Sequence, residues 1–208
     1  MAIPPNLLKF SAIRMPPTLF TIGHSNHETD RFVKLLRDHH IDLLIDTRSH
    51  PYSKYSAQFN KDILRQVVTR NRIQYSFMGD SLGGRPPSSD FYDEQGHVRY
   101  DLIARTSSFL ASLDHILDGA KRWRLALLCS EEDPTHCHRR RLVGRVLLQR
   151  GARLLHIRGD GTLQEESELS PDPADASDSQ LPLFGAEPKP WRSTQSVLSK
   201  DGPVTSGL

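Results

Sequence analysis

Five short apolar runs that alternate with segments of helical periodicity constrain the fold of this 208-residue chain more than any other feature. The runs lie at 18–25, 41–49, 73–79, 124–130 and 153–159. Apolar residues recur at helical spacing over 27–40, 61–72, 101–122 and 134–150. Strands and helices in such alternation build a mainly parallel sheet with helices on both faces. We therefore expect a single α/β domain of about five mainly parallel strands flanked by helices.

Local signals predict where two of these helices begin and end. Ser25 and Glu28 have the spacing of a capping box, which predicts an N-cap at Ser25. Asp133 and Pro134 predict the N-cap and first residue of the last helix, and Gly151 predicts its end.

The predicted helix at 134–150 would direct particular side chains toward the sheet. His138 and Arg139 lie one turn before apolar residues of the same helix, so they should face the sheet near Cys129. Cys137 should lie about 100° around the axis, on the flank of the helix.

Composition divides the chain into three parts. Residues 1–17 form an N-terminal extension, in which Met15 offers an alternative start, and residues 18–164 form the α/β domain. Residues 165–208 are rich in Ser, Pro, Asp and Ala, which predicts a flexible acidic and polar tail. The part from 1 to 164 holds 24 Lys or Arg against 17 Asp or Glu. This excess favours an anionic partner such as a nucleotide or nucleic acid, although solvated surface arginines explain it equally well.

The sequence also predicts where the protein resides. No apolar run approaches the eighteen residues or so that span a membrane, and the proline-containing N-terminus lacks the apolar core of a signal peptide. We expect a cytoplasmic protein without a membrane partner, whose two cysteines are free thiols.

Polar side chains follow the apolar runs, at the edge where open parallel sheets bind ligands. His24 and Ser25 follow the first run, and Asp46 and Arg48 end the second. An arginine directly after a buried strand needs an anion or a carboxylate, so Arg48 is expected either to bind substrate or to pair with Asp46 or Glu131.

A loop after the second run interleaves aromatic and basic residues. Tyr52, Lys54, Tyr55 and Phe59 have a pattern that suits stacking on a base or following a phosphate backbone. The same pattern is also typical of an ordinary loop packed by its own aromatic rings.

Both cysteines lie in the stretch "LLCSEEDPTHCHRRRL", residues 127–142. In one interpretation Cys129 is a nucleophile, with Glu131 or His138 as general acid or base. In a second, Cys129, Cys137 and His138 bind a metal with His24 as fourth ligand, although this spacing is not a common zinc pattern. In a third, the cysteines are buried small apolar residues and His138 is a core histidine. These interpretations remain open, and the sequence predicts no particular cofactor.

Four ordered blocks carry a resemblance to a known family. "TIGHSNHETDRFVKLL", "LLIDTRSHPYSKYSAQFN", "SLGGRP" and "LLCSEEDPTHCHRRRL" with "HIRGDGTL" resemble the domain of unknown function 488 family over about residues 18–164. The resemblance implies an α/β fold and a shared site without naming a reaction. Lys54 stands where arginine is more often expected, a departure that keeps the charge. The implied site falls on Gly23, His24, Ser25, Asp46, Arg48, Pro51, Ser53, Cys129, Glu131, Cys137, His138 and Arg139.

A second resemblance lies in the tail. "QLPLF" is similar to the pentapeptide by which bacterial proteins bind the replication sliding clamp. Short docking motifs of this kind fold onto a groove when they bind. An incidental apolar cluster is the alternative. The residues that would contact the clamp are Gln180, Leu181, Leu183 and Phe184.

Taken together, these features favour an enzyme that acts on a nucleotide or nucleic acid, in DNA repair or processing. Its catalytic residues would be Cys129, Glu131 and His138. Its substrate-binding residues would be His24, Ser25, Asp46, Arg48, Ser53, Lys54 and Arg139. The alternatives are a non-enzymatic adaptor or a ligand- or metal-binding module that docks on the sliding clamp, and a thiol redox protein that uses Cys129 and Cys137.

Overall fold

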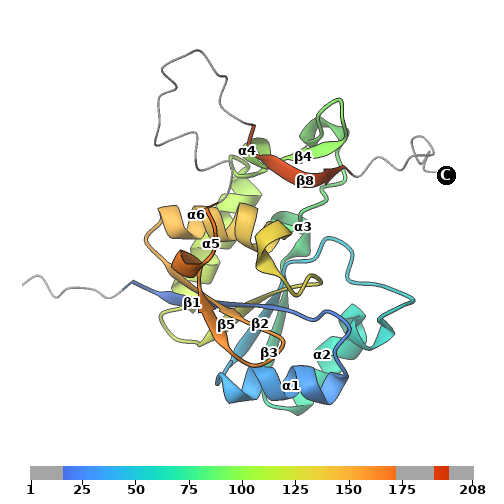
Figure 1. The fold of residues 1–208 in the computed structure, drawn as a ribbon, viewed down its shortest axis with the longest axis vertical. Coiled ribbons are helices and arrows are strands. Elements are labelled where there is room, and N and C mark those ends of the chain that lie inside the picture. The colour runs from blue at the N-terminus through green and yellow to red at the C-terminus, as the bar shows by residue number, and fades with distance from the viewer. Residues whose placement is uncertain (1–15, 172–189, 197–208) are drawn as a thin grey trace, which may run out of the picture.

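A mainly parallel sheet forms the centre of the protein, as the alternating pattern predicted (Figure 1). The computed structural model describes residues 16–171 and 190–196. The six strands follow the order β3-β2-β5-β1-β6-β7, and every neighbouring pair is parallel except β6 with β7. The strands are β1 (Thr18–Gly23), β2 (Leu43–Asp46), β3 (Gln74–Phe77), β5 (Leu125–Cys129), β6 (Arg153–Ile157) and β7 (Leu163–Glu165).

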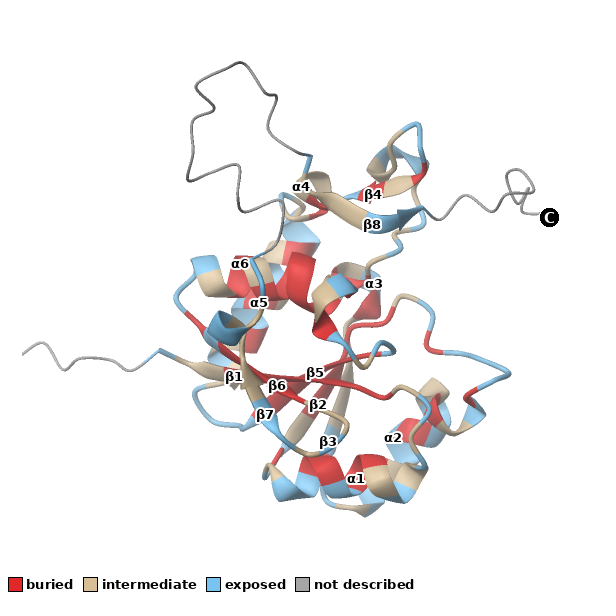
Figure 2. Ribbon diagram, viewed as in Figure 1, coloured by how far each residue is buried: buried red, intermediate tan, exposed pale blue. Residues whose placement is uncertain are grey.

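Helices cover both faces of this sheet and bury two apolar cores (Figure 2). On one face, α1 (Thr29–Asp38) and α2 (Lys61–Arg70) pack residues such as Phe32 and Leu64 against Phe20 and Leu128. On the other face, α5 (Ser107–Gly119), the π-helical turn η4 (Arg139–Gly144) and α6 (Arg145–Gln149) pack against residues such as Leu127. Burial on both faces explains why the strand sequences read as continuous apolar runs.

Shorter elements connect the layers. They are η1 (Ala57–Phe59), α3 (Gly79–Leu82), η2 (Ser89–Phe91), α4 (Tyr100–Ile103), η3 (Pro134–His136) and η5 (Glu166–Glu168). Among the described residues, no helix is long and apolar enough to cross a membrane.

The tail predicted to begin at residue 165 contains ordered structure. Strand β8 (Arg192–Ser196) pairs antiparallel with β4 (His97–Arg99) to form a second, two-stranded sheet. Trp191 contacts the ring of Tyr100 edge-on and donates from Nε1 to the carbonyl of Arg141 at 2.8 Å. Residues 192–196 therefore form an ordered strand within a segment that was expected to be largely flexible. The pentapeptide at 180–184 lies outside the described residues.

Two helix starts differ from their prediction. The capping box at Ser25 does not form: α1 begins at Thr29 after Glu28, and Ser25 adopts a left-handed conformation with φ of 46°. The long helix predicted over 101–122 is divided into α4 and α5, and α5 begins at Ser107, where the side chain of Thr106 caps it by accepting a hydrogen bond from the Phe109 amide.

The predicted continuous helix at 134–150 is broken. Asp133 does cap a helical turn at Pro134, by accepting from the Thr135 amide at 2.8 Å. Cys137 then adopts an extended conformation, with φ of −99° and ψ of 142°, before the chain becomes helical again at His138. Gly151 ends the helix with φ of 80°, as predicted.

Candidate functional site

The site lies at a point where neighbouring strands send their connections in opposite directions. Strands β1 and β5 are adjacent and parallel. The chain leaves β1 through α1 toward β2 on one side, and leaves β5 through α6 toward β6 on the other. Open parallel sheets bind ligands in the crevice at such a switch point, outside the carboxyl ends of the strands.

A close backbone contact joins the ends of these two strands. The amides of His24 and Ser25 donate to the carbonyls of Cys129 and Ser130 at 3.0 and 2.8 Å. A Cβ atom on Gly23 would lie 1.7 Å from the carbonyl oxygen of Glu131. Only glycine therefore allows the loop after β5 to cross the end of β1.

The buried side chain of Arg139 holds the loop after β5 in place by hydrogen bonds. Its side chain is fully buried, and its Nη1 and Nη2 atoms donate to the carbonyls of Glu131 and Glu132, the latter at 2.6 Å. Its Nε donates to Thr21 Oγ1 at 3.3 Å. The sequence placed Arg139 as an anion-binding residue, but these contacts give it a structural role: it positions Glu131.

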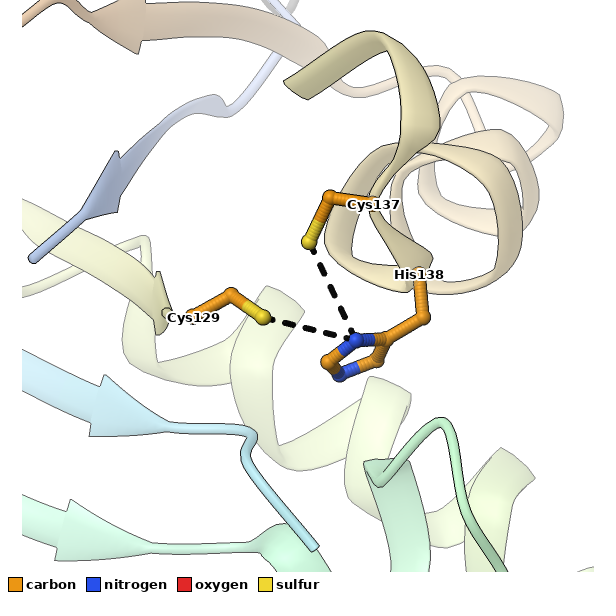
Figure 3. A group of neighbouring side chains, drawn as sticks. All are labelled: Cys129, Cys137 and His138. Carbon is orange, nitrogen blue, oxygen red and sulfur yellow. Dashed lines mark hydrogen bonds between the residues drawn. The ribbon is translucent and has the colours of Figure 1, made fainter. Parts of the chain in front are cut away.

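Cys129, Cys137 and His138 converge in one cluster (Figure 3). The Nδ1 atom of His138 lies 3.5 Å from Cys129 Sγ and 3.9 Å from Cys137 Sγ. Both cysteines are free thiols. The prediction that His138 faces the sheet near Cys129 is confirmed. The prediction that Cys137 lies on the helix flank is wrong, because its extended backbone turns the side chain inward.

The environment of the cluster separates the two thiols chemically. A hydrogen bond from Cys137, together with the charges of His138 and Arg139, holds the pKa of Cys129 well below its usual range despite burial. Burial and the neighbouring Cys129 raise the pKa of Cys137. Burial opposes protonation of His138, yet the charge of Cys129 raises its pKa overall. Cys129 is thus the thiol that ionises first.

Two adjoining cavities lie at this edge of the sheet, and the cluster lines the first of them. One, of about 280 Å³, is lined by all three cluster residues and also by Gly84 and Arg85. The second, of about 350 Å³, is lined by residues that include His24, Ser25, Ser53 and Tyr52. Both cavities share Arg48, His50, Ser130 and Glu131, so they form two halves of one site.

Arg48 is held in place by a carboxylate. Its Nε and Nη2 donate to the two oxygens of Asp46 at 2.9 and 2.6 Å, and Nη2 also donates to the Phe59 carbonyl at 2.9 Å. Tyr75 donates to the same carboxylate at 2.7 Å, and burial raises the pKa of its hydroxyl. Of the two roles expected for Arg48, the ion pair with Asp46 is present. Asp46 lines neither cavity, and its oxygens are occupied.

His24 belongs to the second cavity and not to the cluster. Its ring stacks on Phe59 with centroids 4.3 Å apart, and Nδ1 donates to the Ser25 carbonyl at 2.8 Å. Burial lowers its pKa to about 4. Among the described residues the group able to hold a metal is Cys129, Cys137 and His138, so His24 is not a fourth ligand.

Lys54 does not line either cavity. Its ammonium lies 4.9 Å from the ring centroid of Tyr55, which is 85% exposed. The contact between them is a cation–π contact on the surface beside the second cavity.

Several residues of the site went unpredicted. Thr47 accepts at its carbonyl from His138 Nε2 at 3.0 Å, and His50, Arg85 and His136 line the first cavity. The sequence "LGGR" contained a signal for Arg85, because its glycines allow a close approach of the backbone. A Cβ atom on Gly84 would lie 2.7 Å from His138 Cβ, so only glycine lets the loop that carries Arg85 pack on the cluster. His50 and His136 lie in loops whose paths no local pattern reveals.

The fold and site define a class of protein: a parallel α/β domain with a cysteine–histidine cluster at the carboxyl edge of its sheet. The chain belongs to the family described as Domain of unknown function DUF488, which it matches over residues 28–146. No curated protein and no solved structure matches the chain.

Proposed function

We propose that the protein is an enzyme that acts on a phosphate-bearing nucleotide or a single-stranded nucleic acid. The observation that carries the proposal is the content of the first cavity, which combines a cysteine–histidine cluster, a carboxylate and several cationic or ionisable side chains. A cavity with convergent polar groups and groups of shifted pKa is the usual form of an active site.

The side chains at the mouth of the cavity suit an anion. Arg85, His50 and His136 line it and are exposed, and none makes a side-chain hydrogen bond or ion pair within the described residues. The buried Arg48 lies behind them, but its charge is balanced by the ion pair with Asp46, so the exposed side chains would bind the anion. Arginine and histidine donors of this kind bind phosphate oxygens.

Aromatic side chains beside the second cavity suit a base. Tyr52 lines this cavity and is 60% exposed, and Tyr55 follows three residues later. Exposed tyrosine rings stack on bases without sequence preference, and each stacked base contributes about 1–3 kcal/mol. A nucleotide with its phosphate near Arg85 and its base near Tyr52 would occupy both halves of the site.

Glu131 is the residue best placed to move a proton. Its two acidic neighbours are occupied, because Glu132 pairs with Arg158 at 2.8 Å and Asp133 caps a helical turn. The Glu131 carboxylate makes no hydrogen bond or ion pair to the described residues and lines both cavities. These features fit a general acid or base.

Substitution of Glu131 tests this proposal. Wild-type protein, Glu131→Gln and the control Glu94→Gln would be incubated with adenosine monophosphate and with a short single-stranded DNA oligonucleotide. Glu94 is exposed and lines neither cavity. Phosphorus NMR and mass spectrometry would detect any new phosphorus species, released base or cleaved strand. We expect wild-type and Glu94→Gln protein to convert one of these probes, and Glu131→Gln to be slower by about 100-fold or more.

Two results would contradict the proposal. The first is that no probe is converted by wild-type protein over a range of pH and with divalent metal ions present. The second is that Glu131→Gln protein converts the probe at the wild-type rate.

Thiol redox chemistry is a second candidate, favoured by the proximity of the two cysteines. The ligand atoms of the cluster all lie within 4.8 Å of one another, so the two sulfurs need only a local movement to reach the disulfide distance of about 2 Å. In that reaction Cys129 and Cys137 would lose two electrons and two protons to an oxidant such as diamide. Mass spectrometry of diamide-treated protein tests it: failure to lose two hydrogens would exclude this candidate.

A further inference from the structure

We propose that Cys129, Cys137 and His138 bind a thiophilic divalent metal ion, and that zinc is the ion this donor set favours. The inference deepens the function proposed above, because it names the cofactor of the same site. It rests on that function for the role of the metal, whereas binding of the metal can be measured without a substrate.

The spacing of the donor atoms fits a tetrahedral ion. His138 Nδ1 lies 3.5 and 3.9 Å from the two sulfurs, and all three atoms lie within 4.8 Å of one another. In a zinc site with Zn–S of about 2.3 Å and Zn–N of about 2.0 Å, neighbouring donors lie roughly 3.5–3.8 Å apart. An ion between these atoms therefore requires shifts of no more than about 1 Å.

The orientation of the histidine also fits. His138 Nε2 donates its hydrogen to the Thr47 carbonyl at 3.0 Å, so in the neutral ring, which is the form that binds a metal, the lone pair of Nδ1 faces the two sulfurs. Histidines that bind metals usually donate their other ring N–H to a carbonyl or carboxylate, which fixes the tautomer. Gly84 packs against the same ring and would clash with it if it carried a side chain.

The local backbone lets two adjacent residues, Cys137 and His138, direct their side chains to one ion. Adjacent residues on a regular helix point about 100° apart, so Cys137 and His138 could not both bind one ion from a helix. Cys137 is instead extended, and His138 is the first residue of the following helical segment. This break directs both side chains to the same point (Figure 3).

The position of the cluster leaves room for a further ligand. All three residues line the first cavity. Three protein donors with a fourth position open to a cavity is the arrangement of catalytic zinc sites, whereas structural sites are closed by four. An ion held here would supply Lewis acidity to an oxygen of a substrate in the cavity.

Metal content and cobalt spectroscopy test the inference. Untagged wild-type protein would be purified without chelators and compared with Cys129→Ser, Cys137→Ser and His138→Gln, with the exposed His115→Gln as the matched control. Elemental analysis should find about one zinc ion per chain in wild-type and His115→Gln protein, and at least a several-fold loss in each cluster variant. Cobalt added to metal-free wild-type protein should give intense visible bands of tetrahedral geometry and thiolate-to-cobalt charge transfer.

A wild-type protein that neither retains zinc nor gives the cobalt spectrum would overturn the inference. So would full metal content in all three cluster variants. The cobalt spectrum of the wild-type protein keeps the test decisive if a variant fails to fold. A protein that binds zinc but converts no nucleotide or oligonucleotide would refute the proposed function alone, whereas undiminished conversion by metal-free protein would show that the reaction needs no ion.

Discussion

At the level of single residues, several side chains of the site are held in place by ion pairs or hydrogen bonds to other parts of the protein. Arg48 is held by Asp46, Arg139 by two loop carbonyls, and His138 by the carbonyl of Thr47. Glu131 and Arg85, by contrast, line the cavity without such partners among the described residues. This division separates the groups that shape the site from the groups available to a ligand.

His24 should make stability depend on pH. Burial lowers its folded-state pKa to about 4, whereas the unfolded value is near 6.5. Between these values the unfolded chain binds more protons, so stability falls as the pH falls through this window, by on the order of 3 kcal/mol in full. His24→Phe keeps a ring stacked on Phe59 but cannot titrate.

Urea unfolding of both proteins at about pH 7.5 and about pH 4.5 checks this expectation. The other titrating groups are common to both, so the difference between the two pH responses isolates His24. An equal loss of stability in wild-type and His24→Phe protein would show that this histidine titrates normally.

At the level of elements, the sequence predicted the five parallel strands, since their apolar runs are long enough to recognise. It missed β7, whose three residues "LQE" have no apolar pattern, and β4 and β8, which pair across nearly a hundred residues. It also joined η3, η4 and α6 into one helix. The residue after this break, His138, donates to the carbonyl of Thr47, which lies 91 residues away along the chain, and no local pattern reveals such a contact.

The same limit applies to the site. The residues at the ends of β1, β2 and β5 could be found because parallel strands place their carboxyl ends at one edge. The role of Arg139 could not be predicted from the sequence, because the carbonyls to which it donates belong to a loop whose path no local pattern reveals.

Loss of Arg139 should loosen the loop after β5. Arg139→Met keeps much of the buried volume but leaves the carbonyls of Glu131 and Glu132 without their donors. Each unsatisfied buried acceptor costs about 1–3 kcal/mol, so we expect a destabilisation of about 2–5 kcal/mol in urea unfolding. Arg140→Met, which removes a contact to Glu166 at 2.7 Å but none to this loop, is the comparison variant for the site. Equal effects of both changes on probe conversion would contradict the positioning role.

At the level of the whole molecule, a distant segment completes the first cavity. Ser193, Thr194, Gln195 and Ser196 of β8 line it, although they lie more than fifty residues beyond Cys137. Trp191 holds this strand against the domain through Tyr100, Arg145 and the carbonyl of Arg141. Strand β8 therefore forms one side of the first cavity, although it belongs to the two-stranded sheet with β4 and not to the six-stranded sheet (Figure 1).

Trp191→Ala should therefore affect ligand binding more than folding. We expect the KM of the converted probe to rise about tenfold or more, because part of the cavity wall is released, while global stability falls by only about 1–2 kcal/mol. Steady-state kinetics and urea unfolding measure the two effects. An unchanged KM in folded Trp191→Ala protein would show that β8 has no part in binding.

The central claim is that the joined cavities at the ends of β1, β2 and β5 bind a nucleotide beside the cysteine–histidine cluster. The most direct measurement is a crystal structure of the protein with adenosine monophosphate. The account predicts that the phosphate lies between Arg85 and His50, with the base toward Tyr52 and the nucleotide adjacent to Glu131. Nucleotide bound on another surface, or empty cavities at saturating nucleotide, would contradict it.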